Sequence, residues 1–308
     1  MWSQIAVFGL LPFAIPTVYG WGATGHQAVG YVAMQFLSPK ALSFVQSSLG
    51  TTYNRSLGPA ATWADDVKSQ TAYKWSSVLH YVDAEDDPPY SCSVSESRDC
   101  GDGKCILTAI ANYTSRVVDT SLSATQRQEA LKFLDHFIGD IGQPLHVEAL
   151  EVGGNDIDVK CSGSTSNLHS VWDSGLVNKL VSSNYGNSVT TWANALVSRL
   201  NSGTYRSSAA SWISCASTTS TVKRSLEEDI TGYLDRRAIT PLRCPLTWAA
   251  DTNTFDCSHV FEYSSGQDLC TSSYYTNAVP VIETQIAKQG YRLAAWLNVL
   301  FDGSTNLP

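Results

Sequence analysis

Positive charge is scarce in this chain. Its 308 residues include 20 Lys and Arg against 28 Asp and Glu, which gives a formal charge of −8 with neutral histidines. Proteins that grip duplex nucleic acid by its phosphates are usually basic, so the composition argues against that class. If the substrate is an anion, bound metal ions must supply much of the local positive charge.

Long apolar segments are absent after the first 20 residues, so no later segment is predicted to span a bilayer. Residues 5–18 do form an apolar run, and Val18-Tyr19-Gly20 ends in a residue small enough for cleavage. This pattern predicts a secretory signal over residues 1–20, although its first four residues carry no positive side chain. The alternative, a membrane anchor, is disfavoured because the run is short. We therefore expect residues 21–308 to form one secreted domain.

The cysteines lack the paired CxxC spacing of a zinc ribbon, so we interpret them as disulfide partners rather than metal ligands. Their number is even and allows four disulfides, which suits an oxidising compartment. They are Cys92, Cys100, Cys105, Cys161, Cys215, Cys244, Cys257 and Cys270. The glycosylation sequons at Asn54 and Asn112 are usable only on the secretory route and agree with this interpretation.

Strand-like alternation is also scarce, and no internal repeat or linker divides the chain. Helix signals dominate instead. A helix is expected to begin after Ser38 and to end at Gly50. Residues 126–141 are apolar around most of their circumference, which indicates a buried central helix. Two further amphipathic helices are expected at 191–200 and 281–300.

Only residues 79–84 and 157–160 have a pattern compatible with strands. The composition predicts loops at 84–105, 206–224 and 251–276, which the cysteines would hold in place. The sequence therefore predicts a mainly α, single compact domain with disulfide-stapled loops.

Histidines with acidic residues at helical spacing are the most informative feature of the chain. Five of the six histidines fall into short motifs: His26 in WGATGH, His80 in LHYVDAED, His136 and His146 in HFIGDIGQPLH, and His169 in NLHSVWD. Acidic residues follow three of them by three or four positions: Asp83, Asp140 and Asp173. Such spacings place two side chains on one helix face, about 5–6 Å apart at Cβ, where both can reach one metal ion. The sequence predicts a multi-zinc hydrolase, with His259 outside its site.

The motifs resemble, in order and spacing, those of the fungal S1/P1 nuclease family. They are WGATGH, ATWADD, LHYVDAEDDPP, HFIGDIGQPLH, GGN, NLHSVWD, WAADTNTFDC and IAKQGYRLAAWL, and they span nearly all of residues 21–308. The resemblance implies a mainly helical fold of the S1/P1 nuclease and zinc phospholipase C type that holds three zinc ions. The implied ligand sets are Asp65, His80, His136 and Asp140 for one zinc; His146, His169 and Asp173 for a second; and Trp21, His26 and Asp140 for the third. Trp21 would bind through its α-amino group and carbonyl, which requires cleavage after Gly20.

The resemblance also implies an activity: hydrolysis of single-stranded DNA and RNA to 5′-phosphate products, with 3′-nucleotidase activity, by a monomer. A zinc-bridged hydroxide would be the nucleophile, oriented by Asp65, while Lys68 would neutralise charge on the phosphoryl oxygens. Tyr81, Asp83 and Asn155 would bind a base. The alternatives are a solvated Lys68, a core Tyr81 and a turn residue at Asp83.

Two competing functions remain open at this point: a zinc-dependent phospholipase C, and a non-catalytic secreted zinc-binding protein. The chain also departs from the family pattern. Val147 replaces the usual acidic residue after His146, so a carboxylate that would support the ligands is missing. The resemblance implies the disulfides Cys92–Cys257 and Cys100–Cys105, whereas the pairing of the other four cysteines stays open. Residues 206–246 also look longer than the family pattern.

Overall fold

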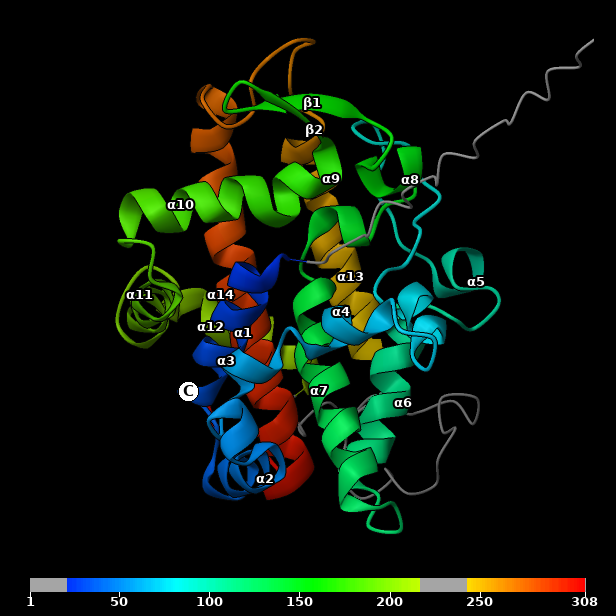
Figure 1. Ribbon diagram of the computed structural model, residues 1–308, viewed down its shortest axis with the longest axis vertical. Helices are drawn as coiled ribbons and strands as arrows, with labels where there is room; N and C mark the ends of the chain where they lie inside the picture. Colours follow the sequence, from blue (N-terminus) through cyan, green and yellow to red (C-terminus); the bar gives the residue numbers. More distant parts are fainter. Residues whose placement is uncertain (1–20, 217–242, 308) are drawn as a thin grey trace, which may run out of the picture.

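The computed structural model describes residues 21–216 and 243–307, which pack around one hydrophobic core (Figure 1). The expected signal at residues 1–20 and most of the long 206–246 segment lie outside the described residues. No helix in the described part of the chain has both the length and the apolar character needed to cross a bilayer.

Helices make up most of the fold. The first half contains α1 (Ala23–Met34), α2 (Pro39–Leu49), η1 (Thr51–Tyr53), α3 (Leu57–Ala60), α4 (Trp63–Lys68), η2 (Lys74–Leu79), α5 (Glu96–Asp99), α6 (Ile106–Val118), α7 (Ala124–Asp140), η3 (Pro144–His146) and α8 (Glu151–Gly154). The second half contains α9 (Leu168–Ser170), η4 (Val171–Gly175), α10 (Leu176–Asn184), α11 (Val189–Asn201), α12 (Arg206–Trp212), η5 (Ser214–Ala216), α13 (Arg243–Phe255), η6 (Asp256–Val260) and α14 (Ser273–Asp302).

Three long helices, α1, α7 and α14, form the centre of the molecule (Figure 1). Every residue of α7 from Ala130 to Asp140 is buried, as its apolar circumference predicts. Gly290 of α14 lets that helix approach α1 closely, because a Cβ there would lie 2.5 Å from a side-chain carbon of Val32. The close approach fixes α1, and with it His26, against the centre of the fold.

Local capping explains the start of α7 but not the start of α2. Ser123 accepts a hydrogen bond from the Gln126 backbone N–H, and the Gln126 side chain accepts one from the Ser123 N–H, so a capping box opens α7. Helix α2 begins after Ser38 and ends at Gly50, as predicted. The Ser38 hydroxyl, however, bonds to Asn298 of α14 instead of capping its own helix.

One of the two predicted strand segments is a strand. β1 (Asp158–Cys161) pairs with β2 (Ser164–Asn167) in a single antiparallel hairpin. The strand considered for residues 79–84 is wrong, because this segment finds no continuous partner. Its backbone instead makes separate bonds, from the Val82 N–H to the His146 carbonyl (2.9 Å) and from the Ile106 N–H to the Tyr81 carbonyl (2.9 Å).

All three loop predictions need correction. Residues 96–99 of the first segment form α5, and residues 206–212 and 214–216 of the second form α12 and η5. In the third segment, residues 251–260 belong to α13 and η6, and residues 273–276 begin α14. The sequence gives little helical signal for α13 and η6, because both bury polar side chains and their apolar periodicity is therefore weak. Thr252, Asn253 and Asp256 are all at most 1% exposed.

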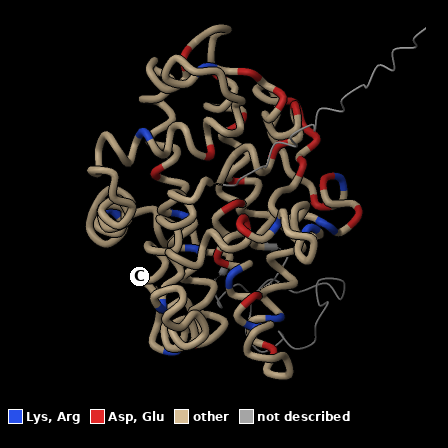
Figure 2. Tube along the Cα trace, viewed as in Figure 1, with Lys and Arg blue, Asp and Glu red and all other residues tan. Residues whose placement is uncertain are grey.

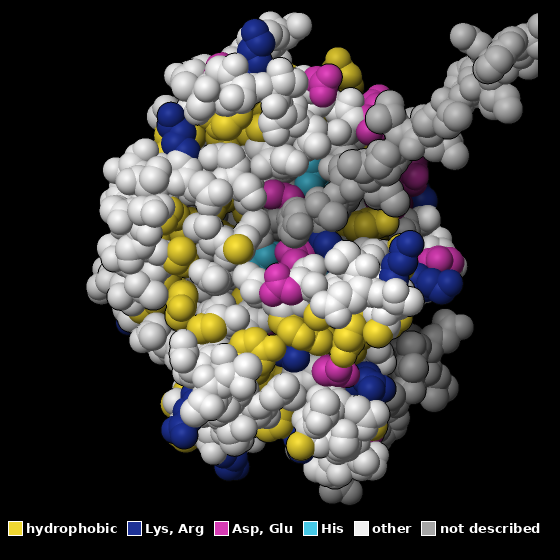
Figure 3. Space-filling view, viewed as in Figure 1, with side chains coloured by type: hydrophobic (Ala, Val, Ile, Leu, Met, Phe, Trp, Pro, Cys, Tyr) yellow, Lys and Arg dark blue, Asp and Glu magenta, His cyan; other side chains and the backbone are white. Residues whose placement is uncertain are grey.

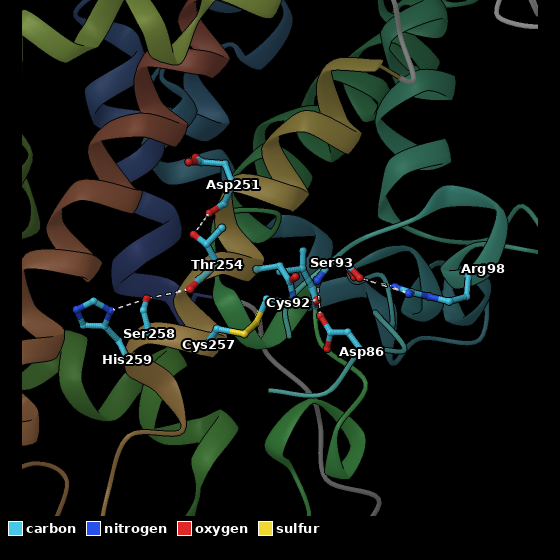
Figure 4. The surroundings of a disulfide bond; sticks show 11 residues. Asp86, Cys92, Ser93, Arg98, Asp251, Thr254, Cys257, Ser258 and His259 are labelled. Carbon is cyan, nitrogen blue, oxygen red and sulfur yellow. Dashed lines mark hydrogen bonds between the residues drawn. A yellow bond between two sulfur atoms is a disulfide. The ribbon is translucent and has the colours of Figure 1, made fainter. Parts of the chain in front are cut away.

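Four disulfides hold the loops to the helices. They join Cys92 to Cys257, Cys100 to Cys105, Cys161 to Cys270, and Cys215 to Cys244. The first two are the pairings implied by the resemblance. Figure 4 shows the disulfide Cys92–Cys257, which ties the acidic loop after residue 84 to η6, directly after α13. His259 lies beyond this bridge, where its Nδ1 contacts the Ser258 hydroxyl at 2.9 Å (Figure 4).

Candidate metal centre

Five histidines and three aspartates from separate elements meet in the interior. Seven of the eight are at most 3% exposed and Asp65 is 8% exposed. They are His26 of α1, Asp65 of α4, His80 after η2, His136 and Asp140 of α7, His146 of η3, His169 of α9 and Asp173 of η4. The structure thus brings together all eight side chains whose motifs pointed to metal binding.

The larger group surrounds Asp140, at the end of α7. Its Oδ2 lies 3.0 Å from His80 Nδ1 and 3.1 Å from His136 Nε2, and its Oδ1 lies 3.1 Å from His26 Nε2. Asp65 Oδ1 lies 3.5 Å from His136 Nε2. Two overlapping sets in this group have ligand atoms close enough to share a metal ion: His26, Asp65 and His136, and His80, His136 and Asp140.

The smaller group consists of His146, His169 and Asp173, whose ligand atoms are also close enough for one ion. Asp173 Oδ2 lies 3.2 Å from His169 Nε2, and Asp173 Oδ1 lies 3.8 Å from His146 Nε2. His146 Nδ1 lies 3.5 Å from Asp140 Oδ1, so the two groups are neighbours.

Backbone carbonyls orient three of the imidazoles for metal binding. The Nδ1 atoms of His136, His146 and His169 lie 2.6, 2.9 and 2.6 Å from the carbonyl oxygens of Ala61, His80 and Gly153. A carbonyl can only accept, so each Nδ1 carries a proton, and a neutral ring then directs the lone pair of its Nε2 toward the centre. The Nε2 atoms of His146 and His169 are buried with no hydrogen-bond partner. Convergent lone pairs of this kind fit a bound cation.

The electrostatics of the larger group also favour a cation. Burial lowers the pKa of His80 to about 4. Burial also tends to lower the pKa of His136, but the carboxylates of Asp140 and Asp65 outweigh burial and raise this pKa to about 10. Burial would raise the pKa of Asp140, yet His136 and the other histidines hold it well below its usual range. The buried carboxylates therefore remain charged and require positive charge beside them.

The start of α1 lies beside both groups. Trp21 is fully buried, and the Gly22 N–H donates to the Asp173 carbonyl at 2.8 Å. The His26 ring stacks on that of His136, with centroids 3.8 Å apart. Gly139 makes room for this stack, because a Cβ there would lie 2.9 Å from His26 Nδ1.

Lys68 is a buried residue of this centre rather than a solvated surface lysine. Its side chain is 9% exposed, and its Nζ lies 2.6 Å from Asp65 Oδ1. The spacing of three residues on α4 places both groups on one face, at the edge of the buried cluster.

A pocket lies against the smaller ligand group. It is lined by Tyr81, Asp83, Leu145, Glu148, Val152, Gly153, Asn155 and His169, so it contains the three residues expected to bind a base together with one histidine of the centre. Asp83 lines this pocket, where partial desolvation and the charges of Glu85 and Asp99 raise the pKa of its carboxyl to about 6.

Four pocket residues were not predicted as site residues: Leu145, Glu148, Val152 and Gly153. Val152 is 62% exposed and has φ 57° and ψ 51°, a left-handed conformation that is unfavourable for a β-branched residue. Such strain is common in binding loops. The adjacent GGN motif is the sequence signal that could have located this turn.

Glu148, another pocket residue, is buried. Burial raises the pKa of its carboxyl to about 8; the hydrogen bond from the Leu150 N–H opposes this shift, and the nearby Asp86 reinforces it.

The carboxylate missing at Val147 is not replaced by its neighbour. Val147 is fully buried and Glu148 accepts from the Leu150 N–H at 2.8 Å, away from the ligands. In the described residues, the His146 ring is oriented by the His80 carbonyl instead.

Comparison with known proteins agrees with this geometry. The family model described as S1/P1 Nuclease matches residues 21–302. The chain belongs to the S1/P1 nuclease family. It is 42% identical to Nuclease P1 of Penicillium citrinum over 288 residues, which cover 90% of this chain and 97% of that protein. It is 40% identical to Nuclease S1 of Aspergillus oryzae over 301 residues, which cover 94% and 97%, and 42% identical to Nuclease PA3 of a Penicillium species over 288 residues, which cover 90% and 97%.

Membership of this family of nucleases makes the chain a phosphodiester hydrolase that acts on nucleic acid. The His/Asp groups, with two or more imidazoles at each candidate set, support zinc as its metal.

Proposed function

We propose that the protein is a secreted three-zinc nuclease that cleaves single-stranded DNA and RNA to 5′-phosphate products and also acts on 3′-nucleotides. The observation that carries this proposal is the shared position of His169, which belongs to the smaller ligand group and also lines the pocket. A base in the pocket would therefore bring its own phosphate to the metal centre.

Three zinc ions would be held by the residues described above. Asp65, His80, His136 and Asp140 would hold one, His146, His169 and Asp173 a second, and His26 with Asp140 and Trp21 the third. Bound zinc would supply a deprotonated water near neutral pH and offset negative charge on the phosphate. The position of His26, 3.1 Å from the carboxylate that also faces His80 and His136, supports a shared Asp140.

Asp65 and Lys68 would act on the phosphodiester from the edge of the cluster. Lys68 is held by Asp65 at 2.6 Å, so its ammonium is positioned before substrate arrives. A cation at this point would stabilise the negative charge that builds on the phosphoryl oxygens in the transition state. Asp65 can accept a proton from water at the same edge.

The pocket would take one unpaired base. Tyr81 offers an aromatic face, Val152 an exposed apolar side chain, and the carboxylate of Asp83 an acceptor for a base N–H. Asn155 is held by its own amide, which donates to the Val152 carbonyl at 2.8 Å. A base has to leave its stack to enter such a slot, which favours single strands over duplex.

The acidic loop beside the pocket argues against a lipid-binding surface there. Four acidic residues lie within positions 83–87, and acidic residues follow one another along one edge of the molecule (Figure 2). A phospholipase needs an apolar surface that faces the lipid, and this charged loop does not provide one. The zinc phospholipase C alternative is therefore disfavoured, and the complete set of ligands disfavours a non-catalytic protein.

A substrate panel tests the proposal. Purified protein is incubated with single-stranded DNA, duplex DNA, RNA, a 3′-nucleotide and phosphatidylcholine, with and without a chelator. We expect chelator-sensitive cleavage of the single strands and of RNA, with 5′-phosphate ends, and release of phosphate from the 3′-nucleotide. Preferential cleavage of duplex DNA or of phosphatidylcholine would contradict the proposal.

Secretion and maturation belong to the same proposal. The four disulfides point to an extracellular protein, and Asn54 and Asn112 are exposed, as glycosylation requires. Cleavage after Gly20 would free the α-amino group of Trp21 beside Asp173. An extra alanine before Trp21 should then lower zinc content by about one ion per chain and lower activity, whereas full zinc and activity would exclude the amine as a ligand.

A further inference from the structure

An aromatic surface lies beside the metal centre and has no role in the site described so far. It is formed by Trp63 of α4 and by Tyr73 and Trp75 at the start of η2. Trp75 is 54% exposed and Val78, three residues later, is 40% exposed. Hydrophobic side chains gather below the acidic and histidine side chains at the centre of the face shown in Figure 3. Exposed apolar groups gathered in this way often mark a binding surface.

The indole of Trp75 is held in place. Its Nε1 donates to the Ala72 carbonyl at 2.9 Å, and its ring centroid lies 6.4 Å from that of Tyr73 and 5.9 Å from that of Phe133. Trp63 contacts the same two rings, with centroid distances of 5.3 and 5.0 Å. A ligand ring that stacks on an indole fixed in this way costs little side-chain entropy.

The aromatic surface is continuous with the metal centre. Trp63 begins the helix that carries Asp65 and Lys68, and the Ser77 hydroxyl of η2 donates to the Lys68 carbonyl at 3.2 Å. Phe133, on which both indoles rest, lies one helical turn before His136 on α7. Trp75 thus packs against elements that also carry residues of the metal centre.

The aromatic surface and the pocket are separate. None of Trp63, Tyr73 or Trp75 lines the pocket of Tyr81 and Asn155. In Figure 1, α8, which forms part of the pocket, lies well above α4. One base cannot contact both.

The charges around the aromatic surface favour bases over phosphates. Two acidic residues, Asp66 and Glu129, accompany two basic ones, Lys74 and Lys132. Glu129 accepts a hydrogen bond from the Tyr73 hydroxyl, and Lys132 Nζ lies 3.6 Å from the Trp63 ring centroid. With these charges balanced, the exposed ring faces are the main feature that a single strand can bind.

We propose that Trp75, supported by Tyr73 and Trp63, stacks against a second base of a single-stranded substrate, away from the base held near Tyr81. This inference rests on the proposed function, because only an unpaired base has a free face to stack on the indole. Trp75 would thus increase affinity for polymers without touching the reacting phosphate.

Kinetics on substrates of two sizes test this inference. The long substrate is a single-stranded oligonucleotide, and the short one is the methyl phosphodiester of a nucleoside 3′-phosphate, which has one base. For Trp75→Ala we expect the KM of the oligonucleotide to rise about fivefold or more, with unchanged kcat and an unchanged KM for the short substrate. Trp75→Phe, which keeps an aromatic face, should retain most of the affinity.

Tyr275→Ala is the matched control, because Tyr275 is a half-buried tyrosine of α14 that contacts Lys179. It should leave both KM values unchanged, and the melting temperature of each variant checks that it is folded. An unchanged oligonucleotide KM in Trp75→Ala, or an equal rise for both substrates, would overturn the inference alone. Failure of the unmodified protein to prefer single strands would instead contradict the proposed function.

Discussion

The metal centre and the pocket begin at adjacent residues but are built differently. His80 is 1% exposed, and its partners come from helices that the core holds in place. Tyr81, the next residue, is half-buried and faces a pocket whose other wall is the left-handed turn at Val152. Chemistry thus rests on rigid, buried groups, whereas recognition rests on exposed groups in loops. Mutations in the two regions should accordingly change different kinetic constants.

The largest effect is expected from His136→Ala, which removes an imidazole from the middle of the metal centre. Loss of a group that merely supports a ligand already costs 10–100-fold in metal affinity or activity, so we expect activity to fall by at least about 100-fold. Elemental analysis should find about three zinc ions in the unmodified protein and fewer in the variant. His259→Ala, outside both ligand groups, is the control and should keep its zinc. Full activity in His136→Ala would remove the metal centre from the mechanism.

Lys68→Ala should affect the chemical step. Removing one group that stabilises transition-state charge typically costs about 100-fold or more in kcat, and KM should change little because the ground state loses no contact. The effect should be equal for nucleic acid and for a nitrophenyl phosphodiester. Lys40→Ala, which changes an exposed lysine of α2, is the matched control. A change in KM alone would make Lys68 a binding residue and would blur the distinction between the two regions.

Tyr81→Ala should affect binding instead. Loss of one base–aromatic stack costs about 1–3 kcal/mol, which corresponds to a rise in KM of roughly 5- to 150-fold for nucleic acid. A nitrophenyl phosphodiester, which has no base, should be almost unaffected. If both substrates suffer equally, Tyr81 supports the fold and the base is bound elsewhere.

The smallest effect is expected from pH at Asp83. Its carboxylate can accept a base N–H only when it is ionised, and its pKa is raised to about 6. Binding should therefore be strongest above pH 6 and should weaken as pH falls through that value, by up to about tenfold in KM for the loss of one hydrogen bond. Asp83→Asn should remove this pH dependence, and the nitrophenyl phosphodiester provides the baseline for other titrating groups. A pH profile unchanged by Asp83→Asn would contradict this role.

Segments with strong local signals could be predicted, whereas those with buried polar faces could not. Helix α7 has a capping box at Ser123 and a continuous apolar circumference, and both follow from neighbouring residues. Helix α13 buries Thr252 and Asn253, because Thr252 accepts from Gln285 and Asn253 donates to the Val147 carbonyl. Those partners are distant in sequence, so the segment resembles a polar loop until the fold brings them together.

The sequence by itself determined the mainly helical class, the pairing of His136 with Asp140 and of His169 with Asp173 on single helical turns, and the family resemblance. These depend on spacings of a few residues, which local backbone geometry converts directly into proximity. Tertiary structure alone decided that Cys161 bonds to Cys270, that Cys215 bonds to Cys244, and that Trp75 faces solvent beside the metal centre. Each of these joins elements far apart in the chain, and such contacts arise only when the helices pack around a common core.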